Sequence, residues 1–161
     1  MFKVLRGGPA HSWIGASPDG LVSPSPNHGL SSPGVLEIKC PFNKGNPHSA
    51  VPYPVVPFYY MPQVQGLLEV FDREWCDVYA WTVNGSALYR VNRDREYWAL
   101  MLDMLCDFWW CHVVPARQAS VLGDTELMQS LSPSDTHPMT ERIVAWSREL
   151  SRECKPTVSL K

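Results

Sequence analysis

The sequence predicts an α/β (α+β) domain with a small mixed central sheet flanked by helices. Three features carry this prediction: a short strand pattern at Gly34–Pro41, an amphipathic helix pattern at Tyr59–Asp72, and two alternating segments joined by Asn84-Gly85. Asn-Gly between two alternating segments is the strongest short-range signal for a β-hairpin. The chain has 161 residues, 45% of them hydrophobic and 19% charged, which is typical of one globular domain.

The first two strands are expected on either side of a polar loop. His11 to Ser17 is predicted as a strand, and it is followed by the turn sequence Pro18-Asp19-Gly20. The stretch from Val22 to Pro33 is rich in Ser, Pro, Asn and Gly, which indicates a loop. The next strand is centred on Val35–Ile38, because Val, Leu and Ile are strand formers bounded by a Gly before and a Pro after.

Two carboxylates and a lysine stand at the ends of these strands. Because side chains alternate across a strand, Glu37 and Lys39 point to the same face, where they could form an ordinary ion pair. Asp19 and Glu37 are, however, the only acidic residues before Glu69. Oxygen ligands of this kind favour Mg²⁺ or Mn²⁺, and a neighbouring lysine can stabilise charge on a phosphate. The pattern therefore predicts a cation site.

Three strings of residues resemble the YqaJ/lambda-exonuclease family of the PD-(D/E)xK nuclease superfamily. They are Ser17-Pro18-Asp19-Gly20-Leu21, Leu36-Glu37-Ile38-Lys39-Cys40-Pro41-Phe42 and Tyr60-Met61-Pro62-Gln63-Val64-Gln65. A single string of this kind arises often by chance, whereas three in the right order are specific. The resemblance runs from about Trp13 to about Val113. It implies a restriction-endonuclease-like core.

The family resemblance also implies an activity and a set of site residues. It implies a Mg²⁺- or Mn²⁺-dependent exonuclease that hydrolyses phosphodiester bonds of DNA in recombination or repair. Asp19, Glu37 and the backbone carbonyl of Ile38 would hold the metal, and Lys39 and Gln63 would complete the catalytic set. Tyr60 is expected to pack under the site. DNA is the implied partner, and a homo-oligomer is possible by the same resemblance.

The start of the chain departs from the family pattern. Family members carry an N-terminal helical region with an acidic residue that completes the metal site, whereas this sequence has no acid before Asp19. It resembles a family member that lacks its N-terminal helical part. With one anionic ligand fewer, we expect weak or no DNA degradation by the 161-residue chain. The alternative is a catalytically inactive homologue that binds DNA or a protein.

Candidate DNA contacts lie outside these strings. The net charge of −2 provides no general attraction to nucleic acid, so contacts with phosphate must come from local basic groups. Lys44 lies in a proline-rich segment from Pro41 to Pro57, which matches a variable loop near the DNA in the family. Arg90 and Arg93 belong to a basic cluster near a strand end. All three side chains could also be ordinary solvated charges.

The remaining elements complete the expected fold. Strands are predicted from Cys76 to Val83 and from Ser86 to Arg93, followed by a helix from Arg95 to Val113 that Pro115 ends. We place the nuclease-like core at residues 1–117 and a partly mobile, helical C-terminal extension at residues 118–161. Within that extension, helices are expected at Gly123–Leu131 and Thr140–Glu153.

The cysteines and the apolar runs bear on location. The five cysteines are scattered and form no C-x-x-C pair, which predicts free thiols in place of a zinc site. Free thiols fit an intracellular, reducing compartment, which would be the nucleus or an organelle in a eukaryotic cell. The start lacks a signal-peptide core, and no run approaches the roughly 18 apolar residues of a membrane span. We therefore expect no membrane association.

Overall fold

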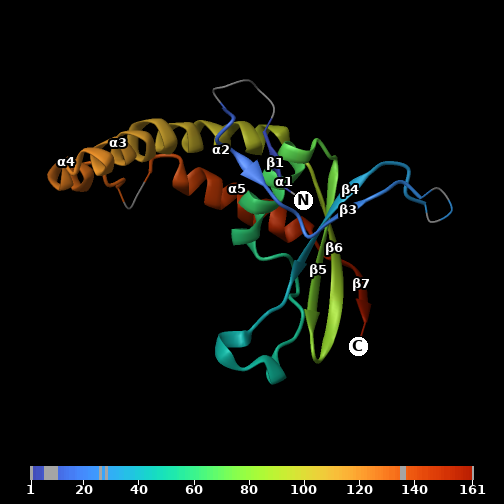
Figure 1. Ribbon diagram of the computed structural model, residues 1–161. Coiled ribbons are helices and arrows are strands. Elements are labelled where there is room, and N and C mark those ends of the chain that lie inside the picture. The colour runs from blue at the N-terminus through green and yellow to red at the C-terminus, as the bar shows by residue number, and fades with distance from the viewer. Residues whose placement is uncertain (1, 6–10, 26, 28, 135–136, 161) are drawn as a thin grey trace. The chain divides into compact units, whose positions relative to one another are not determined.

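The computed structural model describes residues 2–5, 11–25, 27, 29–134 and 137–160. Its central sheet has the strand order β3-β4-β5-β6-β7 (Figure 1). The strands are β3 (Gly20–Val22), β4 (Gly34–Lys39), β5 (Trp75–Thr82), β6 (Gly85–Asn92) and β7 (Pro156–Leu160). β4 and β5 are parallel and the other neighbours are antiparallel. The predicted α/β class with a small mixed sheet is confirmed.

The other elements are a second, two-stranded sheet and the helices. Strands β1 (Lys3–Val4) and β2 (Gly15–Ala16) pair with each other. The helices are α1 (Met61–Phe71), α2 (Arg95–Phe108), the π-helical η6 (Trp109–Val113), α3 (Val114–Leu122), α4 (Thr125–Ser130), α5 (Thr140–Glu153) and the 3-10 turns η3 (Asn43–Gly45), η4 (Pro47–Ser49) and η5 (Phe58–Tyr60). The chain divides into two compact units, residues 1–94 with 146–161 and residues 95–145.

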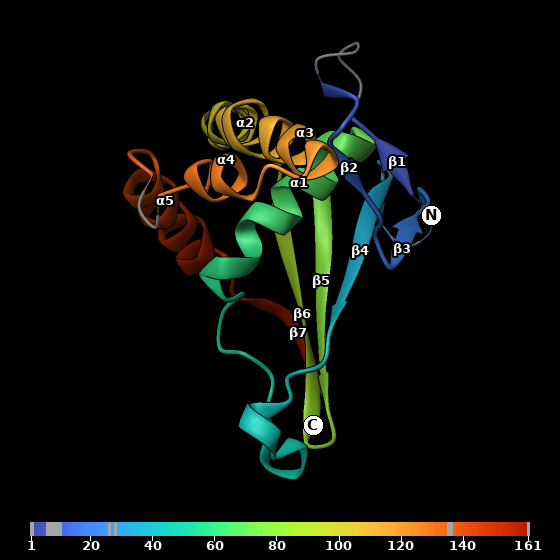
Figure 2. The same ribbon diagram turned by 60° about the vertical axis from the view of Figure 1, so that its left-hand side comes forward.

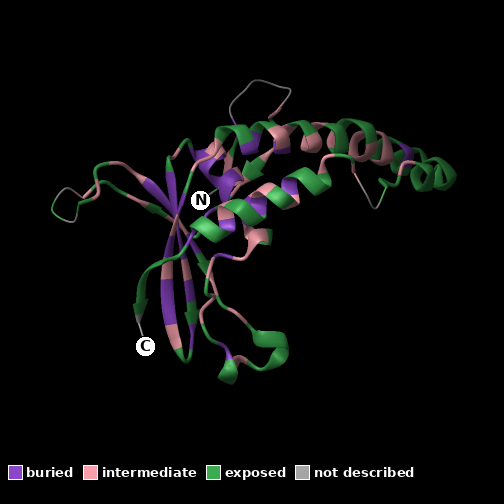
Figure 3. Cartoon of the chain, turned by 180° about the vertical axis from the view of Figure 1, so that it is seen from behind, coloured by how far each residue is buried: buried purple, intermediate pink, exposed green. Residues whose placement is uncertain are grey.

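The core of the first unit lies between α1 and one face of the sheet (Figure 2). The parallel register aligns Val35 with Cys76 and Glu37 with Val78, so these side chains share that face. Figure 3 shows the buried positions concentrated on α1 and the middle strands. The buried apolar residues on this face of the sheet are Val35, Cys76, Val78, Ala80, Ala87, Tyr89 and Val91, and those on α1 are Met61, Val64, Leu67, Leu68, Val70 and Phe71.

The residues at the two ends of helix α1 explain its bounds. Pro62 lies in its first turn, where a missing N–H costs little. Asp72 ends the helix in the left-handed conformation with φ of 53°, and its N–H bonds back to the carbonyl of Glu69. The helix predicted at Tyr59–Asp72 is confirmed, with η5 forming its first residues. This start sets the direction in which the side chains of the first turn point.

The predicted hairpin is confirmed, and its turn also contacts the proline-rich segment. Asn84-Gly85 joins β5 and β6, and Gly85 has a positive φ of 142° that suits glycine. The Asn84 side-chain amide donates to the carbonyls of His48 and Ala50, each at 2.8 Å. The turn therefore anchors the proline-rich segment between β4 and α1.

Two sequence expectations about element ends were wrong. Of the strand expected at His11–Ser17, only Gly15–Ala16 is paired, because the Ile14 N–H bonds to the His11 carbonyl and closes a turn instead. The helix expected to stop before Pro115 continues to Leu122. Pro115 falls in the first turn of α3, directly after the π-helical turn, so its missing N–H does not break the helical run.

The C-terminal residues contain both helices and a strand. α5 has the predicted bounds, and α4 lies inside the short helix expected at Gly123–Leu131, with the Asp124 carboxylate accepting from the Leu127 N–H. Strand β7 was not predicted. It pairs antiparallel with β6 and forms an edge of the sheet. The segment expected to be a helical extension thus supplies part of the central sheet.

The thiols agree with the sequence prediction. All five cysteines are free thiols: Cys40, Cys76, Cys106, Cys111 and Cys154. Burial raises the pKa of Cys154 to about 11, so this thiol stays protonated and unreactive at neutral pH. No helix within the described ranges combines the length and apolar character that crossing a membrane requires.

Candidate functional site

The sheet register brings Asp19 beside Glu37 and Ile38. β3 pairs Gly20 with Leu36, so one residue further along Asp19 falls opposite Glu37. The Ile38 N–H donates to Asp19 Oδ2 at 2.6 Å. The N–H and carbonyl of one strand residue point to the same side, so the Ile38 carbonyl also faces the side of Asp19. The residues expected from sequence to hold a metal are therefore neighbours across the β3–β4 pair.

Glu37, Lys39 and Gln63 form a closed triangle of polar contacts. Lys39 Nζ donates to Glu37 Oε1 at 2.7 Å and to Gln63 Oε1 at 2.8 Å. Gln63 Nε2 donates to the same Glu37 Oε1 at 2.6 Å. β4 supplies the first two residues and the first turn of α1 supplies the third. The structure thus joins residues of two strings that lie far apart in the sequence.

One oxygen of this cluster has no partner. Glu37 is only 5% exposed, and its Oε2 is buried without a hydrogen-bond partner among the residues that the structure describes. A buried carboxylate oxygen is costly unless a donor or a cation pairs with it. A divalent cation beside Glu37, Asp19 and the Ile38 carbonyl would supply that partner with oxygen ligands only. The residues present therefore fit the metal that the sequence predicted.

The number of carboxylates is small for a metal centre. Within the described ranges, no group of three or more His, Cys, Asp or Glu side chains gathers closely enough to hold an ion. An ion at this place would rest on two carboxylates and one carbonyl, with water or phosphate oxygens completing its shell.

Lys39 packs on Tyr60, as expected from the sequence, and Tyr60 contacts a further tyrosine. The Lys39 ammonium lies 4.7 Å from the centre of the Tyr60 ring, a cation–π contact. Tyr60 Oη lies 3.4 Å from Tyr53 Oη, and the Tyr89 hydroxyl donates to the Tyr53 carbonyl. Burial, together with the neighbouring Tyr60, raises the pKa of Tyr53, so its phenol stays neutral. The contacts limit the positions that the Lys39 side chain can adopt.

The two glutamines of α1 serve different places. Gln63 is exposed at the triangle, whereas Gln65 is fully buried. Gln65 donates to the Asn92 carbonyl and accepts from the Asp94 N–H, each at 2.9 Å. Gln65 thus holds the end of β6 against α1 and takes no part in the site.

Arg90 lies on the opposite face of the sheet from Glu37. It is aligned with Asp77, the neighbour of the core-facing Val78, and so faces away from α1. Its guanidinium donates twice to Asp77, at 2.9 Å each, and stacks 4.0 Å from the Trp75 ring centre. The bidentate bond occupies the edge of the guanidinium that a phosphate contact would use. The structure gives no support to the expected DNA contact by Arg90.

Arg93 is also held by carboxylates. It contacts Glu69 at 2.6 Å, Asp72 at 2.9 Å and Glu74 at 3.3 Å, and its side chain is only 7% exposed. Lys44 is different: it is exposed in η3, where its φ of 52° is positive. Of the three expected DNA contacts, Arg90 and Arg93 are paired with carboxylates, whereas Lys44 is exposed and its role stays a prediction.

Replacing Arg93 by Ala tests whether this residue stabilises the fold or contacts DNA. We expect Arg93→Ala to lower the free energy of unfolding by about 1–3 kcal/mol, because Glu69 loses a partly buried cation. DNA affinity should not change. Urea unfolding and DNA-binding titrations measure the two effects, with exposed Arg142→Ala as the matched control. Weaker DNA binding at unchanged stability would instead identify Arg93 as a phosphate contact.

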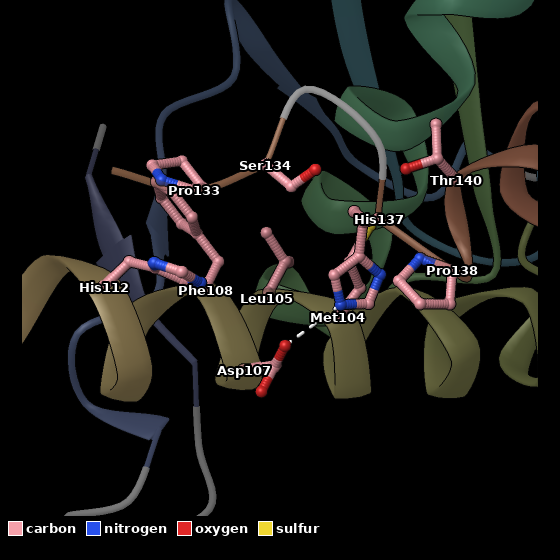
Figure 4. A pocket seen from close by; sticks show the side chains of 10 residues that line it. All are labelled: Met104, Leu105, Asp107, Phe108, His112, Pro133, Ser134, His137, Pro138 and Thr140. Carbon is pink, nitrogen blue, oxygen red and sulfur yellow. Dashed lines mark hydrogen bonds and ion pairs between the residues drawn. The ribbon is translucent and has the colours of Figure 1, made fainter. Parts of the chain in front are cut away.

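The unit of residues 95–145 holds a separate cavity of about 480 Å³ (Figure 4). His137 Nε2 lies 3.0 Å from Asp107 Oδ2, and the Met139 N–H donates to His137 Nδ1. Both ring nitrogens are therefore occupied, and the His137 hydrogen bond holds the pKa of Asp107 below its usual range. The lining residues are Met104, Leu105, Asp107, Phe108, His112, Pro133, Ser134, His137, Pro138 and Thr140. None of them belongs to the β4 site.

Comparison with known proteins identifies a family over the first part of the chain. Residues 2–74 match the model of the YqaJ-like viral recombinase domain. No curated protein and no solved structure matches significantly. The matched segment includes Asp19, Glu37, Lys39 and Gln63, and it ends before β5, short of the extent suggested by sequence. Residues 2–74 are therefore similar to the YqaJ-like viral recombinase domain, which agrees with the family resemblance of the sequence.

Proposed function

We propose that this protein is a Mg²⁺- or Mn²⁺-dependent DNA exonuclease that acts in recombination or repair. The family match indicates a nuclease or recombination function in general terms. The observation that supports the finer proposal is the buried, unpartnered Oε2 of Glu37 beside Lys39 and Gln63. A divalent cation would pair with this oxygen. A phosphate of DNA would then bind to the same cation.

The proposed metal ligands are Asp19, Glu37 and the Ile38 carbonyl. When bound, the ion would lower the pKa of a water molecule and neutralise charge on the phosphate. Asp19 is positioned for this by its hydrogen bond with the Ile38 N–H. Glu37 is held by Lys39 and Gln63 through Oε1, which leaves Oε2 available.

Lys39 and Gln63 would act on the substrate directly. The Lys39 ammonium can donate to an oxygen of the scissile phosphate and stabilise the negative charge that develops there. The Gln63 amide can hold the attacking water, since its oxygen and nitrogen now bond to Lys39 and Glu37 and can exchange one partner for water.

The second candidate function is a catalytically inactive module that binds DNA or a protein. The presence of only two carboxylates at the site, within the described ranges, favours it. Fewer anionic ligands weaken ion binding, and a loosely held water reacts slowly. We therefore expect the exonuclease to be slow. A rate that cannot be distinguished from the metal-free control would favour the binding module.

Metal titration with two variants tests the proposal. Isothermal titration should detect Mg²⁺ or Mn²⁺ binding to the wild-type chain, weakened about tenfold or more in Asp19→Asn and in Glu37→Gln, because each change removes one anionic ligand. Slow loss of linear duplex DNA should require the metal and disappear in EDTA. Glu126→Gln, an exposed carboxylate on α4, is the matched control. Equal metal affinity in all variants would contradict the ligand assignment.

A further inference from the structure

A continuous aromatic segment, Phe58–Tyr60, links Lys39 to an arginine from the far end of the chain. The Lys39 ammonium lies 4.7 Å from the Tyr60 ring centre, and the Arg148 guanidinium lies 4.1 Å from the Phe58 ring centre. Between them, Tyr59 contacts Tyr60 with ring centres 4.7 Å apart and Phe58 at 5.6 Å. One cation therefore stands at each end of three consecutive aromatic side chains.

Arg148 is held in this place by the fold. Its helix, α5, bonds to the segment before Phe58 through Ser151 Oγ, which donates to the buried Val56 carbonyl at 2.6 Å. Trp146, which precedes Arg148 on the same helix, donates through Nε1 to Asp94 Oδ2 at 3.1 Å. These residues belong to the same compact unit as Lys39. Figures 1 and 2 both show the C-terminal half of α5 beside the start of α1.

Arg148 differs from the two arginines that the sequence singled out. Arg90 and Arg93 are occupied by carboxylates, whereas no ion pair between described residues involves Arg148, whose side chain is exposed. A guanidinium stacked on a ring keeps its N–H edge free for a phosphate. Tyr59 is 58% exposed between the two cations, so one face of its ring is open to a ligand.

We propose that Arg148 and Tyr59 bind an unpaired DNA strand that leads to or from Lys39. Arg148 contacts a backbone phosphate and Tyr59 stacks on a base, which is how single strands are bound without sequence preference. The inference rests on the proposed nuclease function, because that function makes a DNA strand the occupant of the neighbouring site. It assigns a role in binding to Tyr59, which lies inside the matched segment, and to Arg148, which lies outside it.

Binding is measured on the full chain in EDTA, so that hydrolysis plays no part. The probe is a fluorescein-labelled single-stranded oligodeoxythymidine, followed by fluorescence anisotropy over a series of salt concentrations. We expect Arg148→Ala to weaken binding about 5- to 10-fold and to reduce the salt slope by about 0.7, the value for one phosphate contact on a single strand. Arg142→Ala, on the same helix, should match wild type in both quantities.

Tyr59 is tested with a conservative pair of variants. We expect Tyr59→Ala to weaken binding by about 5- to 100-fold, because one base loses its stacking partner, with no change in the salt slope. Tyr59→Phe keeps the ring and should bind like wild type. Circular dichroism melting curves identify any variant that is unfolded, and Arg148→Lys, which keeps the charge, then replaces Arg148→Ala with an expected intermediate affinity.

The outcomes separate this inference from the nuclease proposal. Arg148-dependent strand binding by a chain that degrades no DNA would overturn the nuclease function and support the inference. Wild-type affinity and salt slope in Arg148→Ala would overturn the inference, whether or not the chain is a nuclease. Absence of strand binding by the wild-type chain would also overturn it, as would equal weakening by Arg142→Ala.

Discussion

Lys39→Ala is expected to lower the rate of DNA hydrolysis by about 10²–10³-fold, the usual effect of removing one preorganised donor from a phosphate or oxyanion site. Metal affinity should stay the same or increase, because the ammonium competes for Glu37 Oε1 at 2.7 Å. This combination would separate a catalytic lysine from one that only neutralises a carboxylate. In the latter case, metal affinity would still stay the same or increase, but the rate of hydrolysis would change little.

The measurement is a single-turnover assay with enzyme in excess over end-labelled linear duplex DNA, which detects slow cleavage. Lys155→Ala is the matched control, since Lys155 is an exposed lysine with no role in the proposed site or in the expected DNA contacts. Gln63→Glu would add a negative charge beside Lys39 without shortening the side chain. A Lys39→Ala rate within threefold of wild type would contradict the proposed role.

The sheet, α1 and the hairpin could be predicted because each is specified locally. Val35, Leu36 and Ile38 have strand propensity, and Asn84-Gly85 specifies its own turn. β7 could not be predicted in this way. Its residues, Pro156–Leu160, are short and begin with a proline, so only pairing with β6 makes them a strand. The His11–Ser17 prediction failed for the opposite reason, since a local turn at Ile14 replaced the pairing.

The candidate site was more predictable than its surroundings. Asp19, Glu37, Lys39 and Gln63 lie in strings with a family pattern, and the structure brings their side chains to one place. The basic groups have no such pattern. Charge alone does not distinguish Arg90, which pairs with Asp77, from an arginine facing the site. Long-range packing decides this difference, and the sequence does not show it.

The position of Arg148 illustrates the same limit. Nothing in the sequence links α5 to Phe58, which lies 90 residues before Arg148 in the chain. The contact depends on Ser151 bonding to the Val56 carbonyl, a buried interaction between distant segments. The C-terminal residues therefore stabilise η5 and the start of α1, from which Tyr60 and Gln63 respectively reach Lys39. The site depends on residues outside the matched domain.

Leu68→Ala is expected to lower the free energy of unfolding by about 2–5 kcal/mol, because Leu68 is fully buried between α1 and the sheet. The loss combines the transfer free energy of the removed atoms with the cost of the cavity they leave. Leu122→Ala makes the same chemical change at a side chain that is 81% exposed, and should cost less than about 0.5 kcal/mol.

Urea unfolding followed by tryptophan fluorescence compares the two leucine variants at equal protein concentration. The same preparation of Leu68→Ala should retain metal binding in its folded fraction, since Glu37 and Asp19 are held by β4 hydrogen bonds that the change leaves intact. Equal stability of the two variants would contradict the packing of α1 on β4 and β5. It would also remove the support that places Gln63 beside Lys39, because that support is the position of α1 on the sheet.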